Sequence, residues 1–174
     1  KLVLLSLSES GYSTVWEKPR PSAVRPDSQQ FILSDGNIVF RYKEDSPTVI
    51  FNGSLSHIIT HSAEDMYHNY GRLCGVVQGD KLLYSRLVSG FGISLDIYDC
   101  YSHNHICCLP TKVGRKDGIS TATDAATGCF AITDWMGKTL NLFTSNYQLH
   151  KKVELGFWPG SVNGVSCVGG TIAV

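Results

Sequence analysis

The chain has 174 residues, and its fifteen Lys and Arg side chains balance fifteen Asp and Glu side chains, so the formal net charge is zero. A neutral chain offers no general field for nucleic acid or for an anionic membrane surface. Its composition, 43% hydrophobic, is too apolar for a disordered protein. The longest apolar run, Leu2 to Leu5, is far short of the roughly 20 residues that span a bilayer.

Short apolar or alternating runs, separated by turn residues, follow one another along the chain, and helical periodicity is nearly absent. Asp35-Gly36, between two such runs, is a strong hairpin signal. Between residues 52 and 73 we expect a loop with a short helical turn after Ser62, although Ile58 to Thr60 favours an extended segment. In chain order, the predicted strands are residues 2–7, 13–17, 30–34, 37–42, 48–52, 73–78, 81–87, 94–99, 105–109, 118–123, 129–133, 139–144, 150–155, 162–168 and 171–174.

The strands repeat as a pattern of an apolar strand, a tight turn and a second apolar strand, which starts near Gln30, Gly71, Gly128 and Val162. Units of roughly 40–45 residues with four short strands are typical of β-propeller blades. Three units lie near residues 22–56, 70–109 and 115–156, and strands from 162–174 and 1–18 make a fourth.

We therefore predict an all-β fold, a single β-propeller domain over residues 1–174 with about four four-stranded blades. One of these blades is closed by strands from both termini. The alternatives are another all-β sandwich or barrel, a part of a larger ring, or a ring that two chains build together.

Two segments resemble an NHL-type blade: GCFAITDWMGKTLNLFTSNYQLHKKVEL, and WPGSVNGVSCVGGTIAV as the start of the next. A second resemblance is to kelch repeats, on LDIYDCYSHNHICCLP, VWEKPRP and Gly169-Gly170. The motifs are degenerate, and no unit carries both kelch signatures. The NHL resemblance also implies RNA binding as one function of such propellers, but a neutral chain ranks RNA below a protein partner.

The segment DCYSHNHICC contains five residues of zinc-ligand type, Cys100, His103, His105, Cys107 and Cys108. On a regular strand, residues 103, 105 and 107 point to one face and residue 108 to the other. No CxxC pair stands elsewhere, and the HxxxH pair His57 and His61 would lie about 13 Å apart on a strand, too far for one metal. We therefore predict no metal site and no cofactor, and we interpret the segment as a polar turn followed by a strand with a buried thiol.

Other chemistry has weaker signals. A propeller hydrolase would hold a metal at the central channel through carboxylates of several blades. The candidates for such a site are the strand-end residues Asp35, Asp96, Asp99, Asp124 and Asp134. Asp at a strand end is more often a turn former, and no nucleophile elbow, phosphate loop or dinucleotide fingerprint is present. We predict no catalytic residues.

Aromatic residues in loops are typical anchors of protein interfaces. Those we predict to bind a partner are Trp135, Phe157, Trp158, Tyr67 and Tyr70. The predicted function is a non-catalytic binding platform for a protein or peptide partner, with the loops as its binding face and a homodimer as one possibility. The alternatives are the metal-dependent hydrolase and an RNA- or carbohydrate-binding propeller.

The compartment has only indirect signals. Six cysteines in this length are too sparse for a disulfide scaffold, which favours the cytoplasm. The sequon Asn52-Gly53-Ser54 keeps secretion open as the alternative.

Overall fold

The computed structural model describes residues 1–9, 11–22, 24, 28–41, 46–62, 71–88, 92–111, 113, 119–134, 138–156, 166–168 and 170–173. All the regular structure in these residues is antiparallel β-sheet. The described residues contain no helix that is long and apolar enough to cross a membrane. The helical turn predicted after Ser62 lies outside the described residues.

Three sheets have four strands each, paired in chain order. Blade 1 consists of β3 (Gln29–Ile32), β4 (Ile38–Arg41), β5 (Thr48–Phe51) and β6 (His57–His61). Blade 2 consists of β7 (Gly71–Val77), β8 (Lys81–Val88), β9 (Gly92–Asp99) and β10 (His105–Cys108). Blade 3 consists of β11 (Ile119–Thr123), β12 (Phe130–Asp134), β13 (Thr139–Phe143) and β14 (Leu149–Glu154).

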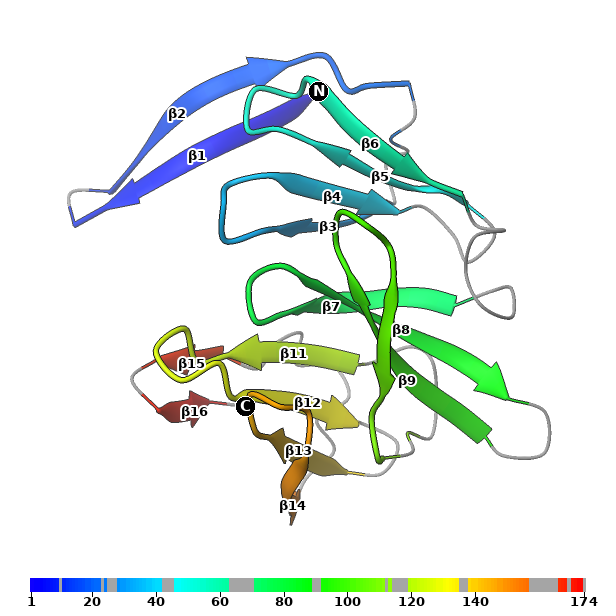
Figure 1. Ribbon diagram of the computed structural model, residues 1–174. Coiled ribbons are helices and arrows are strands. Elements are labelled where there is room, and N and C mark those ends of the chain that lie inside the picture. The colour runs from blue at the N-terminus through cyan, green and yellow to red at the C-terminus, as the bar shows by residue number, and fades with distance from the viewer. Residues whose placement is uncertain are drawn as a thin grey trace.

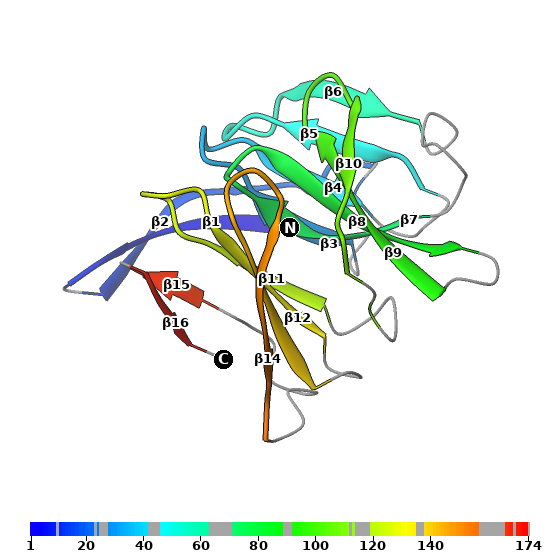
Figure 2. The same cartoon turned by 60° about the horizontal axis from the view of Figure 1, so that its bottom comes forward.

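Two hairpins complete the described structure, β1 (Leu2–Ser8) with β2 (Gly11–Lys18), and β15 (Ser166–Val168) with β16 (Thr171–Ala173). In Figure 1 the sheets follow one another from the blue β1–β2 hairpin, past the three blades, to the red β15–β16 hairpin. Figure 2 shows the same sheets from a second direction. The first strands of successive sheets, β3, β7, β11 and β15, contact one another in this order.

An apolar layer fills each space between neighbouring sheets. Between blades 1 and 2 the layer includes Val39, Ile50 and Tyr84, and between blades 2 and 3 it includes Leu95 and Ile132. Leu2 and Trp16 of the first hairpin pack on blade 1, and Cys167 and Ile172 of the last hairpin pack on blade 3. Both faces of each blade are therefore largely apolar, which explains why many strand sequences read as continuous apolar runs instead of alternating ones.

The inner turn of blade 2 ties that blade to blade 3. Gln78 has a left-handed backbone (φ 55°), and its N–H donates to the Thr123 hydroxyl at 3.0 Å. Its side-chain amide donates to the carbonyl oxygens of Gly128 and Ser145, and the Tyr147 hydroxyl donates to its Oε1. A single turn residue thus joins the strand ends of two blades.

The structure differs from the sequence prediction at two places. β6 is the fourth strand of blade 1, where we expected a loop. In addition, the strands of the two ends form two separate two-stranded sheets in the described residues, not one shared four-stranded blade. They flank opposite ends of the row of blades (Figure 1), because each packs on a different neighbouring blade.

Candidate functional site

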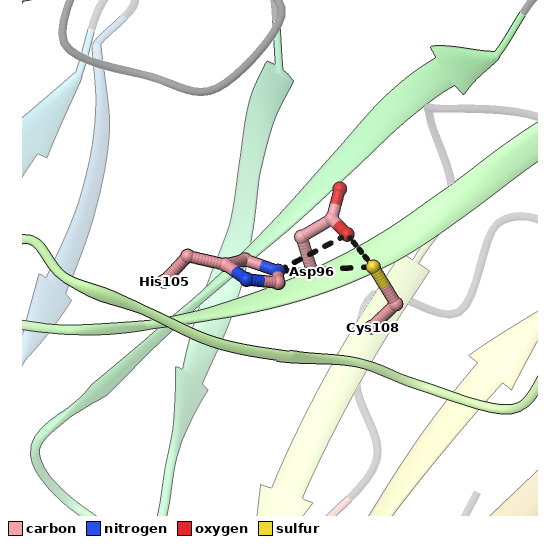
Figure 3. A group of neighbouring side chains, drawn as sticks. All are labelled: Asp96, His105 and Cys108. Carbon is pink, nitrogen blue, oxygen red and sulfur yellow. Dashed lines mark hydrogen bonds and ion pairs between the residues drawn. The ribbon is translucent and has the colours of Figure 1, made fainter.

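Three side chains of metal-ligand type meet on the outer half of blade 2. Asp96 lies on β9, and His105 and Cys108 lie on β10, the last strand of the blade. One ligand atom from each lies within 4.8 Å of the other two (Figure 3). The Cys108 thiol donates to Oδ1 of Asp96 at 2.8 Å, and His105 Nε2 lies 3.7 Å from this oxygen and 3.7 Å from the Cys108 sulfur.

A β-bulge brings His105 and Cys108 to the same face. His105 pairs with Tyr98, and Cys108 pairs with Asp96, so the ladder skips Ile106. The extra residue reverses the side-chain alternation beyond it. Cys107, opposite Ile97, therefore packs toward blade 3. The sequence prediction that His105 and Cys107 share a face with Cys108 on the other is wrong for this reason.

Asp96 is a buried carboxylate with a fixed partner for each oxygen. Its relative exposure is 1%. Arg86 Nε on β8 donates to Oδ2 at 2.9 Å, and the Ser94 hydroxyl donates to Oδ1 at 3.2 Å. Burial opposes the charge of the Arg86 guanidinium, but its bond to Asp96 and the carboxylate charge raise the pKa of Arg86. Arg86 thus holds one carboxylate oxygen and leaves Oδ1 directed at His105 and Cys108.

The Cys108 thiol is a hydrogen-bond donor in this arrangement. Burial, and then the bond to Asp96 and its charge, raise the pKa of Cys108. A nucleophilic cysteine instead needs a lowered pKa, with a base next to the sulfur. Here the carboxylate bonds the sulfur directly, and His105 does not lie between them. The arrangement suits metal coordination better than a cysteine nucleophile, because thiolate, imidazole and carboxylate are the zinc ligand types.

The remaining candidate ligands of this segment lie apart from the cluster. The His103 ring stacks on His61 between blades 1 and 2, with ring centroids 4.2 Å apart. His61 Nε2 bonds the carbonyl oxygen of Cys100 at 2.7 Å. All six cysteines lie in the described residues, and none forms a disulfide.

The strand-end carboxylates do not gather at one place. In the part of the chain that the structure describes, Asp96 alone among them belongs to a group of three possible ligands. It lies on the third strand of its blade, not on an inner strand, as a central-channel site would require. The sequence analysis named Asp96 as a candidate for a metal site at the central channel. In the structure its neighbours are His105 and Cys108, and both face it because of the bulge in β10.

The aromatic residues predicted to bind a partner, Trp135, Phe157, Trp158, Tyr67 and Tyr70, all lie outside the described residues. Their role therefore stays a prediction.

The two terminal hairpins carry apolar surface. On β1–β2, the side chains of Val3, Leu5, Tyr12 and Val15 are exposed, with 72% exposure at Tyr12. At the other end, a cavity of about 340 Å³ opens between blade 3 and β15–β16. Apolar side chains line most of it, among them Ala131, Leu142, Phe143 and Ile172.

Comparison with solved structures identifies the architecture. The chain is similar to a streptogramin B lyase (10% identity, TM-score 0.57) and to virginiamycin B lyase from Staphylococcus aureus (13% identity, TM-score 0.58). Each match covers 98% of this chain and 54% of the other. The fold is a β-propeller. A protein of unknown function from Bacteroides caccae is also similar (13% identity, TM-score 0.51, covering 90% of this chain and 54% of that one).

The likeness, at 10–13% identity, concerns the fold alone, and the chain spans about half the length of these structures. No protein-family model and no curated protein sequence matches the chain. The all-β propeller and its four-stranded blades, predicted from the repeats, are confirmed.

Proposed function

We propose that the protein is a non-catalytic β-propeller platform that binds a protein partner, and that this partner is a second copy of the chain. The observation that carries the proposal is the apolar surface at each end of the row of sheets. An NHL-type blade, with kelch as second choice, stays our hypothesis for the repeat family. Side chains on such a rigid scaffold provide specificity with little ordering on binding.

The β1–β2 hairpin has apolar side chains on both faces. Leu2 and Trp16 pack on blade 1, and Trp16 Nε1 also donates to the Gly53 carbonyl at 2.7 Å. Val3 and Leu5 are on the other side of the hairpin and are 52% and 47% exposed. A two-faced apolar sheet is what a propeller places between two neighbouring blades. This favours a second sheet, and not water, against Val3 and Leu5.

The opposite end has a complementary opening. The β15–β16 hairpin covers the part of blade 3 around Ala122 and Ala131, and the cavity beside it reaches Leu142 and His150. β16 pairs on one side only in the described residues, so its other edge can accept a strand. A two-stranded hairpin placed beside β16 would complete a four-stranded blade over this cavity.

The number of strands fits two copies. In the described residues, each copy supplies three four-stranded blades and two two-stranded hairpins. A head-to-tail pair in which each β1–β2 joins the partner's β15–β16 would close a ring of about eight blades, the upper end of the usual range.

The mass of the particle in solution tests the proposal. We expect light scattering after gel filtration to give twice the 19.1 kDa of one chain. Leu5→Lys places a charge in the proposed contact and should weaken association at least about tenfold. Leu87→Lys is the matched control, because Leu87 is also exposed (64%) but lies on the middle blade. A monomer at micromolar concentration, or equal weakening by both variants, would overturn the second copy as the partner.

A further inference from the structure

We propose that Asp96, His105 and Cys108 form a Zn²⁺ site whose fourth position is open to water or to an external ligand. The site is independent of the end-to-end contact proposed above, because it lies on the middle blade. No step of the sequence analysis predicted it. It rests on the type of the three donor atoms, on their spacing and on the groups that hold them.

The donor set selects the metal. One thiolate, one imidazole and one carboxylate are borderline-soft ligands in combination, which suit Zn²⁺ and disfavour Ca²⁺ and Mg²⁺. Structural zinc sites are closed by four protein ligands, whereas sites with three protein ligands keep the fourth position for water or an external ligand. His105 and Cys108 are both exposed, so an ion and a fourth ligand can reach the site from solvent.

Two of the three spacings are close to those of a tetrahedral zinc. Bonds of about 2.3 Å to sulfur and about 2.0–2.1 Å to nitrogen and oxygen separate the ligand atoms by about 3.3–3.6 Å. His105 Nε2 is 3.7 Å from Asp96 Oδ1 and 3.7 Å from the Cys108 sulfur. The third separation, from the sulfur to Oδ1, is 2.8 Å because the thiol proton forms a hydrogen bond there. A small rotation of Cys108 lengthens this separation once the proton is gone.

The coordination step balances without an oxidant or reductant. The S–H bond of Cys108 breaks, a zinc–sulfur bond forms, and the proton passes to water. Asp96 Oδ1 and His105 Nε2 each donate a lone pair and displace water molecules from the hydrated ion. Zinc remains divalent throughout.

Neighbouring groups orient two of the ligands. Arg86 fixes the second oxygen of Asp96, and the Tyr98 ring and the His105 imidazole make a T-shaped contact, with centroids 5.2 Å apart. Partners of this kind raise metal affinity because the ligands need little ordering on binding. The Arg86 charge offsets one of the two negative charges that the thiolate and carboxylate bring to the ion.

Two cysteines that are adjacent in sequence provide a matched test. Cys108→Ser removes a proposed ligand, whereas Cys107→Ser removes a thiol that faces blade 3. We expect calorimetric titration with zinc chloride to give one ion per chain. Affinity should fall at least about 100-fold in Cys108→Ser, since even indirect partners of a ligand contribute about 10–100-fold. It should stay unchanged in Cys107→Ser and in His57→Gln, an exposed histidine on blade 1.

The absorption spectrum of a Co²⁺ complex tests whether Cys108 binds the metal directly, because a purely structural role of Cys108 would leave the spectrum unchanged. Co²⁺ at this site should show a thiolate-to-metal charge-transfer band, absent in Cys108→Ser and retained in Cys107→Ser. Far-ultraviolet circular dichroism of each variant verifies that it is folded. The proposal is overturned by the absence of stoichiometric zinc at micromolar concentration, by an equal loss in both cysteine variants, or by a cobalt complex without the thiolate band.

Discussion

The Asp96 carboxylate is almost fully buried, and Arg86 is the cation that compensates its charge at 2.9 Å. Removal of one partner leaves the other charge buried, which is strongly destabilising. We predict that Arg86→Met lowers the free energy of unfolding by about 2–3 kcal/mol, because Ser94 and Cys108 still donate to the carboxylate. Urea denaturation measures this change.

The control for Arg86→Met is an ion pair that water already screens. Lys1 and Glu17 are 2.6 Å apart, but their side chains are 74% and 46% exposed, so Lys1→Met should leave the unfolding midpoint unchanged. Asp96→Asn should also recover part of the loss when it is combined with Arg86→Met. An Arg86→Met protein as stable as the unchanged one would show that the ion pair contributes nothing.

The Asp99 carboxylate makes the free energy of unfolding depend on pH in the acid range. The Ser102 N–H donates to its carboxylate, as do the Ser102 hydroxyl, Lys81 and the Tyr101 N–H. Against the smaller opposing effect of burial, these bonds lower the pKa of Asp99 from 3.8 to about 2. Because the folded pKa is the lower one, the stabilisation is complete above pH 4 and is lost as pH falls from about 4 to about 2.

Asp99→Asn should therefore lower stability at pH 7 by about 1 kcal/mol, a value discounted because the carboxylate is partly exposed. It should also flatten the loss of stability below pH 4. Urea midpoints measured from pH 7 to pH 2 give both quantities. The exposed Glu9, replaced by Gln, is the control. Parallel pH curves for Asp99→Asn and the unchanged protein would contradict the assignment.

At the scale of elements, β7 and β11 approach each other more closely than side chains normally allow. A Cβ at Gly75 would lie 2.3 Å from Thr121 Oγ1 and 2.9 Å from its Cγ2. Thr121 cannot rotate away at no cost, because its hydroxyl donates to the Val76 carbonyl. We predict that Gly75→Ala destabilises the protein by about 1–3 kcal/mol, as overpacking does in other cores.

The double variant Gly75→Ala with Thr121→Ala should lose less than the sum of the two single changes, because the clash is then mostly removed. Thermal melting followed by circular dichroism measures the three variants. Gly156→Ala is the neutral control, since no atom lies within 4 Å of its added Cβ. A Gly75→Ala protein that melts with the control would show that the two inner strands can separate freely.

The sequence identified most elements because tight turns and apolar strands leave local signals. Asp35-Gly36 marked the hairpin of β3 and β4 correctly. The sequence analysis missed β6 because an outer strand buries few side chains, and His57, Ile58 and Thr60 are exposed there. The sequence analysis missed the cluster of Asp96, His105 and Cys108 because one extra residue, Ile106, decides which of two adjacent cysteines faces Asp96. A bulge of this kind leaves no periodic signal.

For the whole molecule, the repeat spacing was enough to predict a propeller, since each blade is a local unit of four consecutive strands. The relation between the two terminal hairpins could not be predicted, because it depends on contacts between residues at opposite ends of the sequence. The structure places the hairpins on different blades. Closure of the ring is therefore a question of what covers Val3, Leu5 and the cavity beside β16.

Four of the six thiols can show the order in which parts of the molecule unfold. Cys74 and Cys100 are buried between complete blades, whereas Cys167 is half-buried on the β15–β16 hairpin. A two-stranded sheet that packs through one face is less stable than a four-stranded blade held on both faces. With rising urea, we predict that alkylation reaches Cys167 before Cys74 and Cys100, and that exposed Cys129 reacts without urea. Pulse labelling with peptide mass spectrometry measures this order.

The same experiment links the opening of the last hairpin to the proposed partner. If the β1–β2 hairpin of a second copy covers β15–β16, Cys167 is protected in the assembly and loses that protection in Leu5→Lys, while Cys74 and Cys100 label as before. Burial, followed by the charges of nearby carboxylates, raises the pKa of Cys100 to about 12, so its thiol reacts only after unfolding restores an ordinary pKa. Simultaneous labelling of Cys167 with Cys74 and Cys100 in the monomer would instead mean that the hairpin and the blades unfold as one cooperative unit.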